Sequence, residues 1–428
     1  MSSNNDEISL RGALSIGIGG MVGGGIFAVL GLAVSLSGGA TPVAFLIAGF
    51  LALITSYSYV KLSLKFPDSG GTVRFINEGF QKGVFSGAMN NLLWVSYIIM
   101  LALYASAFGS YAPNLLSITG DSNIDFYVYT NAIIILATIV NYYSARVVSV
   151  IETYAVFIKL VILITFVFIG VYGLIGNENL TQLSVSNWES PMNIITGGMV
   201  IFVAYEGFEL IANAAPNIKN AKKNIPKAYY ISVIFVILLY VIIAIITVGS
   251  LSFDVIAKAE DYVMAEAAKP ITGKIGFTVI TIAALISTFS AINASLYGGS
   301  RVSYEIAEDD ELPHELTGKL WSQPVGLIIT SIATLLLANS LNLESISTTG
   351  SVGFLLIFAI VNLTGFRLAK KLNASRIIPL FGFLACTFAL GALVVQQYSA
   401  NRISVIIAFS IIAVCFILEA GYKKWFNG

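Results

Sequence analysis

Long apolar runs separated by short polar segments occupy most of the chain between residues 11 and 423. A membrane-spanning helix needs about 20 predominantly apolar residues, and twelve runs have this length or nearly so. They cover residues 11–36, 42–65, 84–112, 126–146, 150–175, 192–215, 228–251, 273–303, 323–341, 346–369, 377–397 and 401–423. The pattern therefore predicts an all-α membrane protein with twelve transmembrane helices.

Composition agrees with that prediction and narrows the possible partners. Of the 428 residues, 57% are hydrophobic and 11% are charged, whereas a soluble domain carries about 25% charged residues. The formal net charge is zero, so no overall field favours a nucleic acid, and membrane lipid is the surrounding partner that we expect. The single histidine, His314, lies in a charged loop, so we expect no metal site and no cofactor.

Lysines and arginines are distributed unequally between the two sides of the predicted membrane. If twelve helices alternate in direction, one side receives 18 of the 23 basic residues and the other receives four. The four are Lys258, Lys269, Lys274 and Arg402. Because cytoplasmic loops carry the excess of Lys and Arg, the pattern predicts a multi-pass protein of the cell's inner (plasma) membrane with both termini in the cytoplasm.

The first predicted span contains a glycine-rich stretch, Ile18 to Phe27, which reads Ile-Gly-Gly-Met-Val-Gly-Gly-Gly-Ile-Phe. Each glycine inside a helix is less favourable than alanine by about 1 kcal/mol, so this run favours a break. An unwound segment frees backbone N–H groups, and the helix that restarts directs its positive dipole end at the gap. The stretch predicts an anion-binding notch in mid-membrane, suited to a carboxylate. Close packing of a small-residue helix face is the alternative.

The fifth predicted span contains one basic residue, Lys159, in the otherwise apolar line Val156 to Ile162. At 1.5 Å per residue it lies about 14 Å from the start of the helix near Val150. A lysine near a helix end can reach the interface, but this depth is hard to bridge. Because an intramembrane charge by default marks function, we interpret Lys159 as functional; a snorkelling or structural lysine is the alternative.

The sixth span contains a second interruption, between residues 197 and 209, where Glu206, Gly207 and Glu209 stand in an apolar run. Two glycine-interrupted spans at corresponding positions of two halves point to the binding site of a transporter. Glu206 and Glu209 share roughly one face if the helix continues, and they separate if it unwinds. For Glu209 we favour a structural role, in which its carboxylate bonds a helix end or a nearby tyrosine.

The connection between the seventh and eighth spans, residues 254–274, alternates charged with apolar residues. This pattern predicts an amphipathic external helix. Such a helix either covers the substrate pathway or is a solvated loop helix without a gating role, and the sequence leaves both readings open.

Four motifs resemble those of the amino acid–polyamine–organocation transporters. They are Ile18 to Phe27 in the first helix, Phe202 to Glu209 in the sixth, the basic loop Asn217 to Ala228, and Ala307 to Pro313 after the eighth helix. Lys159 is similar to the fifth-helix lysine of a proton-coupled, broad-specificity member. The resemblance covers nearly the whole chain, with matching order and spacing.

The resemblance implies a LeuT-like fold, in which a 5+5 inverted repeat is followed by two further helices. Residues 1–428 would form one transmembrane domain. Its first repeat would be 11–175, its second, inverted repeat 192–369, and its two additional helices would lie in 377–423.

The resemblance also implies the site. The substrate carboxylate would bind the amides of Gly23, Gly24 and Gly25, and the α-ammonium would bind the carbonyls of Met21, Val203, Ala204 and Glu206. The ammonium of Lys159 would contact Gly19 in helix one, with Ser287 and Ser290 of helix eight as further candidates. There it would stand in the place of the sodium ion of sodium-coupled relatives, so the coupling ion would be a proton.

Five positions depart from the family pattern, and two of them, Asp310 and Ala221, replace a usual Gly and Pro in the loops. Gly24 stands where relatives often carry Ser, Thr or Ala, so a hydroxyl contact is missing. Val203 stands where an aromatic lid is common, and the neighbouring Phe202 is a candidate substitute. Glu206 bears on the substrate, because a carboxylate there would favour cationic side chains or simple amines.

We therefore expect a secondary active transporter that takes up amino acids by proton symport with alternating access. An amino acid exchanger or an amine or polyamine transporter is the alternative within transport. A non-transporting membrane receptor is the alternative from another class, against which Lys159 and the intact glycine run argue. An enzyme is not expected, because no Ser/His/Asp, metal or phosphate-binding constellation is present. The sequence does not predict an oligomeric state.

Overall fold

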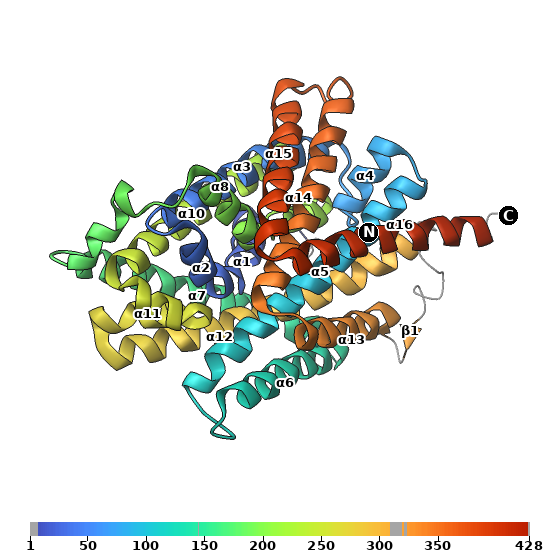
Figure 1. Cartoon of the computed structure of the whole chain (residues 1–428). Helices are drawn as coiled ribbons and strands as arrows, with labels where there is room; N and C mark the ends of the chain where they lie inside the picture. Colours follow the sequence, from blue (N-terminus) through green and yellow to red (C-terminus); the bar gives the residue numbers. More distant parts are fainter. Residues whose placement is uncertain (1–6, 144, 309–318, 321–322, 427–428) are drawn as a thin grey trace.

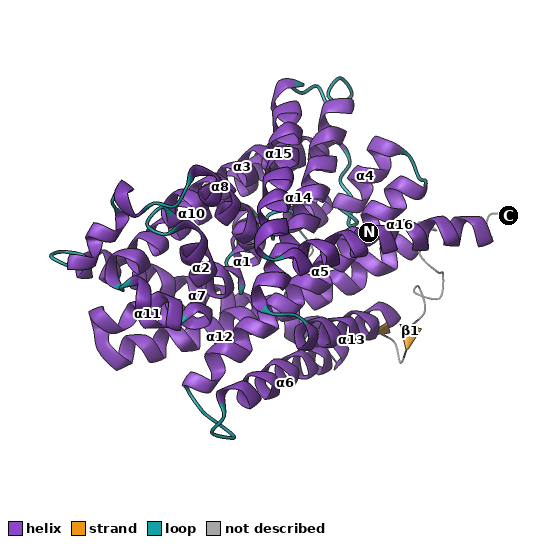
Figure 2. Cartoon of the chain, in the orientation of Figure 1, coloured by secondary structure: helices purple, strands orange, loops and turns teal. Residues whose placement is uncertain are grey.

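The computed structural model describes residues 7–143, 145–308, 319–320 and 323–426, and almost all of them are helical (Figure 2). His314 and most of the motif Ala307 to Pro313 lie outside the described residues. The α-helices are α1 (Leu10–Met21), α2 (Gly25–Ser37), α3 (Thr41–Lys65), α4 (Thr72–Phe80), α5 (Val84–Tyr111), α6 (Ser122–Tyr143), α7 (Ala145–Gly173), α8 (Pro191–Val200), α9 (Leu210–Ala214), α10 (Ala221–Ser250), α11 (Phe253–Lys258), α12 (Val263–Glu308), α13 (Val325–Ser340), α14 (Leu343–Arg367), α15 (Ile377–Ala400) and α16 (Arg402–Phe426). Short 3₁₀ segments are η1 (Ala112–Asn114), η2 (Glu178–Leu183), η3 (Val185–Asn187), η4 (Ile201–Tyr205), η5 (Ala215–Asn217) and η6 (Glu260–Tyr262), and the strands β1 (Lys319–Leu320) and β2 (Gln323–Pro324) form one antiparallel pair.

Within the described residues, ten helices are long and apolar enough to cross a membrane, and the bent pair α1–α2 makes an eleventh span. The predicted span 323–341 corresponds to α13, which has only 16 residues and so falls short of the usual length. The structure confirms an all-helical, multi-pass membrane protein. The count of twelve spans, the inverted repeat and its domain boundaries stay predictions.

The first predicted span is broken where the glycines stand. α1 ends at Met21, α2 begins at Gly25, and the two helices are bent by 43°. The residues from Met21 to Val34 are buried, and Figure 1 shows α1 and α2 in the middle of the bundle, next to α8 and α10. A non-helical backbone at this depth is tolerated where protein surrounds it.

The sixth predicted span is broken as well. α8 passes into the 3₁₀ segment η4, an irregular stretch follows from Glu206 to Glu209, and the helix resumes as α9. Gly207 has a φ of +116°, a backbone conformation that strongly favours glycine. The sequence thus predicts both breaks correctly.

Burial differs between the inner and the outer helices. α5 and α14 are buried over most of their length, whereas α6, α15 and α16 expose large apolar side chains such as Leu136, Phe388 and Ile417. In a membrane-spanning bundle such exposed apolar faces meet lipid. The central helices therefore surround the two breaks with protein and separate them from lipid.

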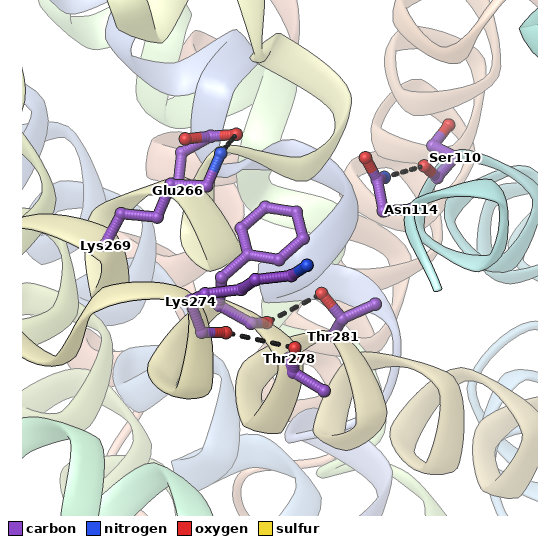
Figure 3. A network of polar contacts seen from close by, with 8 residues as sticks. Ser110, Asn114, Glu266, Lys269, Lys274, Thr278 and Thr281 are labelled. Carbon is purple, nitrogen blue, oxygen red and sulfur yellow. Dashed lines mark hydrogen bonds and ion pairs between the residues drawn. The ribbon is translucent and has the colours of Figure 1, made fainter. Parts of the chain in front are cut away.

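The connection between α10 and α12 forms an outer segment. α11 and η6 pack against α2, and the first turns of α12 bury Val263 and Met264. α12 then changes direction at Gly273, where φ is +64°. Figure 3 shows the exposed side of this segment, where Lys269 pairs with Glu266 at 2.5 Å and Thr278 donates to the carbonyl of Lys274. A helical segment is therefore present between the seventh and eighth spans. It ends at Gly273, where the eighth span begins, and packs against the half-helix after the first break. Its position outside the membrane stays a prediction.

At the N-terminal end of α1, away from the first break, the preceding segment is hydrogen-bonded to the basic loop before α10. The N–H of Ile8 donates to the carbonyl of Asn217 at 2.8 Å, and the N–H of Lys219 donates to the carbonyl of Ile8 at 2.9 Å. An ion pair of 3.0 Å between Glu7 and Lys219 lies beside these bonds. This connection fixes the start of α1 relative to the segment that follows the second break.

Candidate substrate and coupling site

The first break exposes main-chain donors. Within the described residues, the N–H groups of Gly23 and Gly24 have no hydrogen-bond acceptor. Both groups are buried, and a buried N–H without an acceptor is rare in proteins. Two such groups at the start of α2, where the helix dipole is positive, form an arrangement that accepts an anion. This geometry suits an anion, and the notch itself stays a prediction.

Three carbonyl groups at the end of α1 each accept a hydrogen bond from a different donor. The carbonyl of Ile18 accepts from the N–H of Val22 at 2.7 Å. The carbonyl of Gly19 accepts from Nζ of Lys159 at 3.0 Å, and that of Met21 accepts from the hydroxyl of Tyr240 at 2.6 Å. Terminal carbonyls of a helix have no partner inside the helix, and they attract positive charge. The break thus creates the acceptors for a cation on one side and the donors for an anion on the other.

The two breaks lie against each other. A Cβ added at Gly25 would stand 2.9 Å from the Cα of Ala204, and one added at Gly20 would stand 2.9 Å from the carbonyl oxygen of Gly207. Conversely, a Cβ at Gly207 would meet the N of Met21 at 2.6 Å. The glycines therefore serve both readings of the sequence, because they interrupt the helix and also permit close contact between backbones.

Tyr240, from α10, connects the carbonyls of the two breaks. Its hydroxyl lies 2.6 Å from the carbonyl oxygen of Met21 and 3.3 Å from that of Ala204. Two of the four carbonyls that the family resemblance implies for an α-ammonium therefore converge on one point. Each carbonyl oxygen has two lone pairs, so an ammonium group has acceptors there.

The remaining predicted residues of the sixth span point elsewhere. The N–H of Val203 donates to Oγ of Ser351 in α14 at 3.2 Å, and its carbonyl accepts from the N–H of Glu206 at 3.2 Å. The Phe202 ring packs against Phe358 of α14, with 5.8 Å between the ring centroids. The ring closest to the first break is instead that of Tyr104, whose Cδ1 lies 2.5 Å from the position of a Cβ at Gly24.

The two carboxyl groups of the second break have different surroundings. Glu209 accepts from the N–H of Gly207 at 2.8 Å and from the hydroxyl of Tyr97 at 3.3 Å. This is the structural role that the sequence favours for Glu209, which bonds both a helix end and a tyrosine. Glu206 accepts from the hydroxyl of Tyr104 at 3.1 Å.

Lys159 is fully buried in α7, and its bond to Gly19 joins α7 to the end of α1. Ser287 and Ser290 are also fully buried, in α12, which packs along α7. Within the described residues, the Oγ of Ser287 has no hydrogen-bond partner, whereas Ser290 takes part in a further interaction. The structure thus brings Lys159 and Gly19 together, and the part of either serine in coupling stays a prediction.

Sequence reasoning missed Tyr104, Tyr240 and Ser351. All three lie in long spans that contain several other hydroxyl-bearing residues, so the sequence does not distinguish them. A buried tyrosine needs a hydrogen-bond partner, and that requirement is the one indication that the sequence offers for Tyr104 and Tyr240. No group of three or more His, Cys, Asp or Glu side chains in the described part of the chain is arranged to hold a metal ion.

Comparison with known proteins assigns the family. A family model described as "Amino acid permease" matches residues 8–420. An uncharacterised protein of Methanocaldococcus jannaschii is 33% identical over 428 residues, with 99% of this chain and 97% of that protein covered. The inner membrane transport protein YbaT of Escherichia coli is 31% identical, with 99% and 98% covered.

A more distant similarity links the chain to the serine/threonine exchanger SteT of Bacillus subtilis, which is 25% identical over 72% of this chain and 69% of that protein. The family match covers nearly the whole chain and includes both helix breaks. The chain is therefore a multi-pass membrane transporter of the amino acid permease family, within the amino acid–polyamine–organocation superfamily that its motifs resemble.

Proposed function

We propose that the protein takes up amino acids across the cell's inner membrane by proton symport with alternating access. The family match and the named activity of the Bacillus relative support an amino acid as the substrate. At the site, the two free N–H groups of Gly23 and Gly24 suit an α-carboxylate. The carbonyls of Met21 and Ala204 suit an α-ammonium. Both ends of a zwitterion thus have partners within the two breaks.

The observation that carries proton coupling is the bond between Lys159 and Gly19. A charged ammonium is favoured at the carbonyl end of α1, while complete burial disfavours the charge. These opposing effects make the lysine responsive to its surroundings. With the proton bound, Lys159 ties α7 to the end of α1; without it, the charge interaction is lost and the two helices are released. A proton can therefore bias two arrangements, which coupling requires.

Two further features belong to this proposal. The excess of basic residues on one side supports cytoplasmic termini. The broken helices at corresponding places of two halves support a 5+5 inverted repeat. Movement of one repeat against the other would open the site to each side in turn.

Uptake by the purified protein in liposomes tests the proposal. We expect accumulation of at least one labelled amino acid, from a panel that also contains amines, when an inward proton gradient is imposed. Exchanging sodium for potassium should leave the rate unchanged. Accumulation that needs a sodium gradient would refute proton symport.

The second candidate function is amino acid exchange, which the similarity to a serine/threonine exchanger favours. An exchanger would move labelled substrate only when unlabelled substrate is present on the opposite side. Uptake into liposomes without internal substrate separates the two functions.

A further inference from the structure

Glu206 has a carboxyl group that the proposed transport mechanism does not use. It lies at the end of η4, within the second break, and only 3% of the residue is exposed. No lysine or arginine of the described residues pairs with Glu206 or Glu209. A buried charge in a membrane protein is normally paired and by default marks function. The lack of a counter-charge for Glu206 therefore needs an explanation.

A proton on one of the two carboxyl groups removes one of the two uncompensated negative charges in this conformation. Glu206 and Glu209 are both buried, at 3% and 0% exposure, in one short irregular stretch, and no basic side chain of the described residues pairs with either. Two neighbouring buried carboxyl groups without a cation do not both ionise, because burial and the like charge both disfavour the second negative charge. Glu209 accepts the N–H of Gly207 and the hydroxyl of Tyr97, so it is the better carrier of the negative charge, and Glu206 carries the proton.

The other titratable groups around the pair are phenols. They are Tyr59 of α3, Tyr97 and Tyr104 of α5, and Tyr229 of α10. A phenol donates a hydrogen bond but brings no positive charge at neutral pH. The surroundings therefore offer Glu206 a donor, in Tyr104, without a cation.

Tyr104 places this carboxyl group next to the notch. Its ring lies against Gly24 and its hydroxyl donates to Oε2 of Glu206 at 3.1 Å. Thr288 of α12 lies beside the same glycine, with its Cγ2 3.0 Å from the Cβ position of Gly24. A substrate held by the amides of Gly23 and Gly24 would therefore lie beside the Tyr104 ring, whose hydroxyl is hydrogen-bonded to Glu206.

We propose that Tyr104 and Glu206 form a side-chain subsite for a cationic nitrogen, so that the preferred substrates are amino acids with an ammonium or guanidinium side chain. The substrate cation takes the place of the Tyr104 hydroxyl at Glu206. Glu206 changes from –COOH to –COO⁻, and its proton leaves to the solution. One positive charge enters the subsite and one departs, so its net charge is unchanged. This inference rests on the proposed function and names the substrate class of the same site.

L-lysine and L-norleucine, whose side chains share the same four-carbon chain and differ in the terminal ammonium of lysine, provide the test with the full-length purified protein. A charge-assisted hydrogen bond in a buried site corresponds to about ten- to a hundredfold in affinity, so lysine should bind more tightly than norleucine by that factor at pH 8. Lysine binding should release a proton, detected with an indicator dye in weak buffer, and should weaken as the pH falls. Norleucine binding should release none.

Two variants separate the roles of the pair. Glu206→Gln keeps a hydrogen-bonding side chain of the same size, and it should lose both the preference for lysine and the proton release. Tyr104→Phe keeps the ring and removes the hydroxyl that competes for Oε2, and it should bind lysine more tightly relative to norleucine.

Equal affinity of the wild type for both ligands, or an unchanged ratio in both variants, would overturn the subsite. In that case, proton-driven uptake of a neutral amino acid would leave the proposed function standing. If no amino acid of the uptake panel is bound at all, the subsite and the proposed function both fail.

Discussion

At the residue scale, the site is made by groups that the helix breaks leave free and by hydroxyls that reach them from other helices. Gly23 and Gly24 provide donors, the end of α1 provides acceptors, and Tyr104 and Tyr240 reach the two sets from α5 and α10. The absence of a side chain at Gly24 leaves just enough room for the Tyr104 ring. This packing leads to two predictions.

Gly24→Ala should abolish or strongly weaken substrate binding, and the larger Gly24→Val should do the same. The added Cβ would stand 2.5 Å from Cδ1 of Tyr104 and 3.0 Å from Cγ2 of Thr288, so it would displace the ring and fill the notch. Gly391→Ala in α15 is the matched control, because no atom lies within 4 Å of its Cβ position. Calorimetric titration of both folded variants measures the effect. Binding of wild-type strength by a folded Gly24→Ala protein would refute the anion notch.

Tyr240→Phe should destabilise the substrate-free protein by about 1–3 kcal/mol, because two buried carbonyls lose their common donor. The carbonyls of Met21 and Ala204 remain available to an α-ammonium, so a bound amino acid should raise the unfolding temperature more in the variant than in the wild type. Thermal unfolding in detergent, with and without the substrate found in the uptake panel, measures both effects. An equal rise in the two proteins would show that the ammonium binds elsewhere.

The sequence predicts the main-chain part of this site better than the side-chain part. Glycines at fixed places leave a local signature, so the positions of Gly24 and Gly207 are readable. Tyr104 and Tyr240 approach from distant helices, and their roles follow from tertiary packing. The sequence also cannot show that the Val203 and Phe202 side chains are directed toward α14.

At the element scale, the arrangement depends on two interrupted helices that touch at their interruptions. Gly20 and Gly207 are in backbone contact, and Gly25 contacts Ala204. Such close contact between backbones is possible because both helices have glycines where they meet. A displacement of one broken helix is therefore transmitted to the other.

Gly207→Ala should be more destabilising than Gly273→Ala. Both residues have positive φ values, +116° and +64°, which an alanine adopts at a penalty of about 1–3 kcal/mol. Only at Gly207 would the new Cβ also collide with the backbone of Gly20 and Met21, and overpacking adds about 1–3 kcal/mol. Chemical denaturation of the two variants in detergent gives the comparison. Equal stability would mean that the two breaks are not in tight contact.

Hydrophobic runs predict the positions of most helices within a few residues, because the length of a membrane span is fixed by the bilayer. Elements that do not follow that rule were harder to predict. The short α4 was missed and α13 is shorter than a usual span, whereas the eighth span starts at the kink at Gly273, as predicted. The amphipathic part and the apolar part of α12 are two helices that meet at Gly273, and the hydropathy pattern separates them at that residue.

At the scale of the whole molecule, orientation in the membrane follows from the distribution of basic residues. Lys222, at the start of α10, and Lys258, in α11, are both exposed and lie at opposite ends of α10. Lys222→Cys should react with an impermeant maleimide only in opened cells, and Lys258→Cys should react in intact cells. Cys386 and Cys415 are buried and would be replaced by alanine. The reverse pattern of labelling would place the termini outside.

The central claim is that one buried lysine couples substrate movement to a proton. Lys159→Ala removes the link between α7 and the carbonyl of Gly19, while the notch and the carbonyl pair are formed by other residues. The decisive measurement compares wild-type and Lys159→Ala proteins in liposomes with an inward proton gradient, alongside Lys274→Ala as a control for the loss of an exposed lysine. We predict that Lys159→Ala binds substrate but no longer accumulates it in response to the gradient, whereas Lys274→Ala behaves as the wild type. Normal proton-driven accumulation by Lys159→Ala would contradict the account.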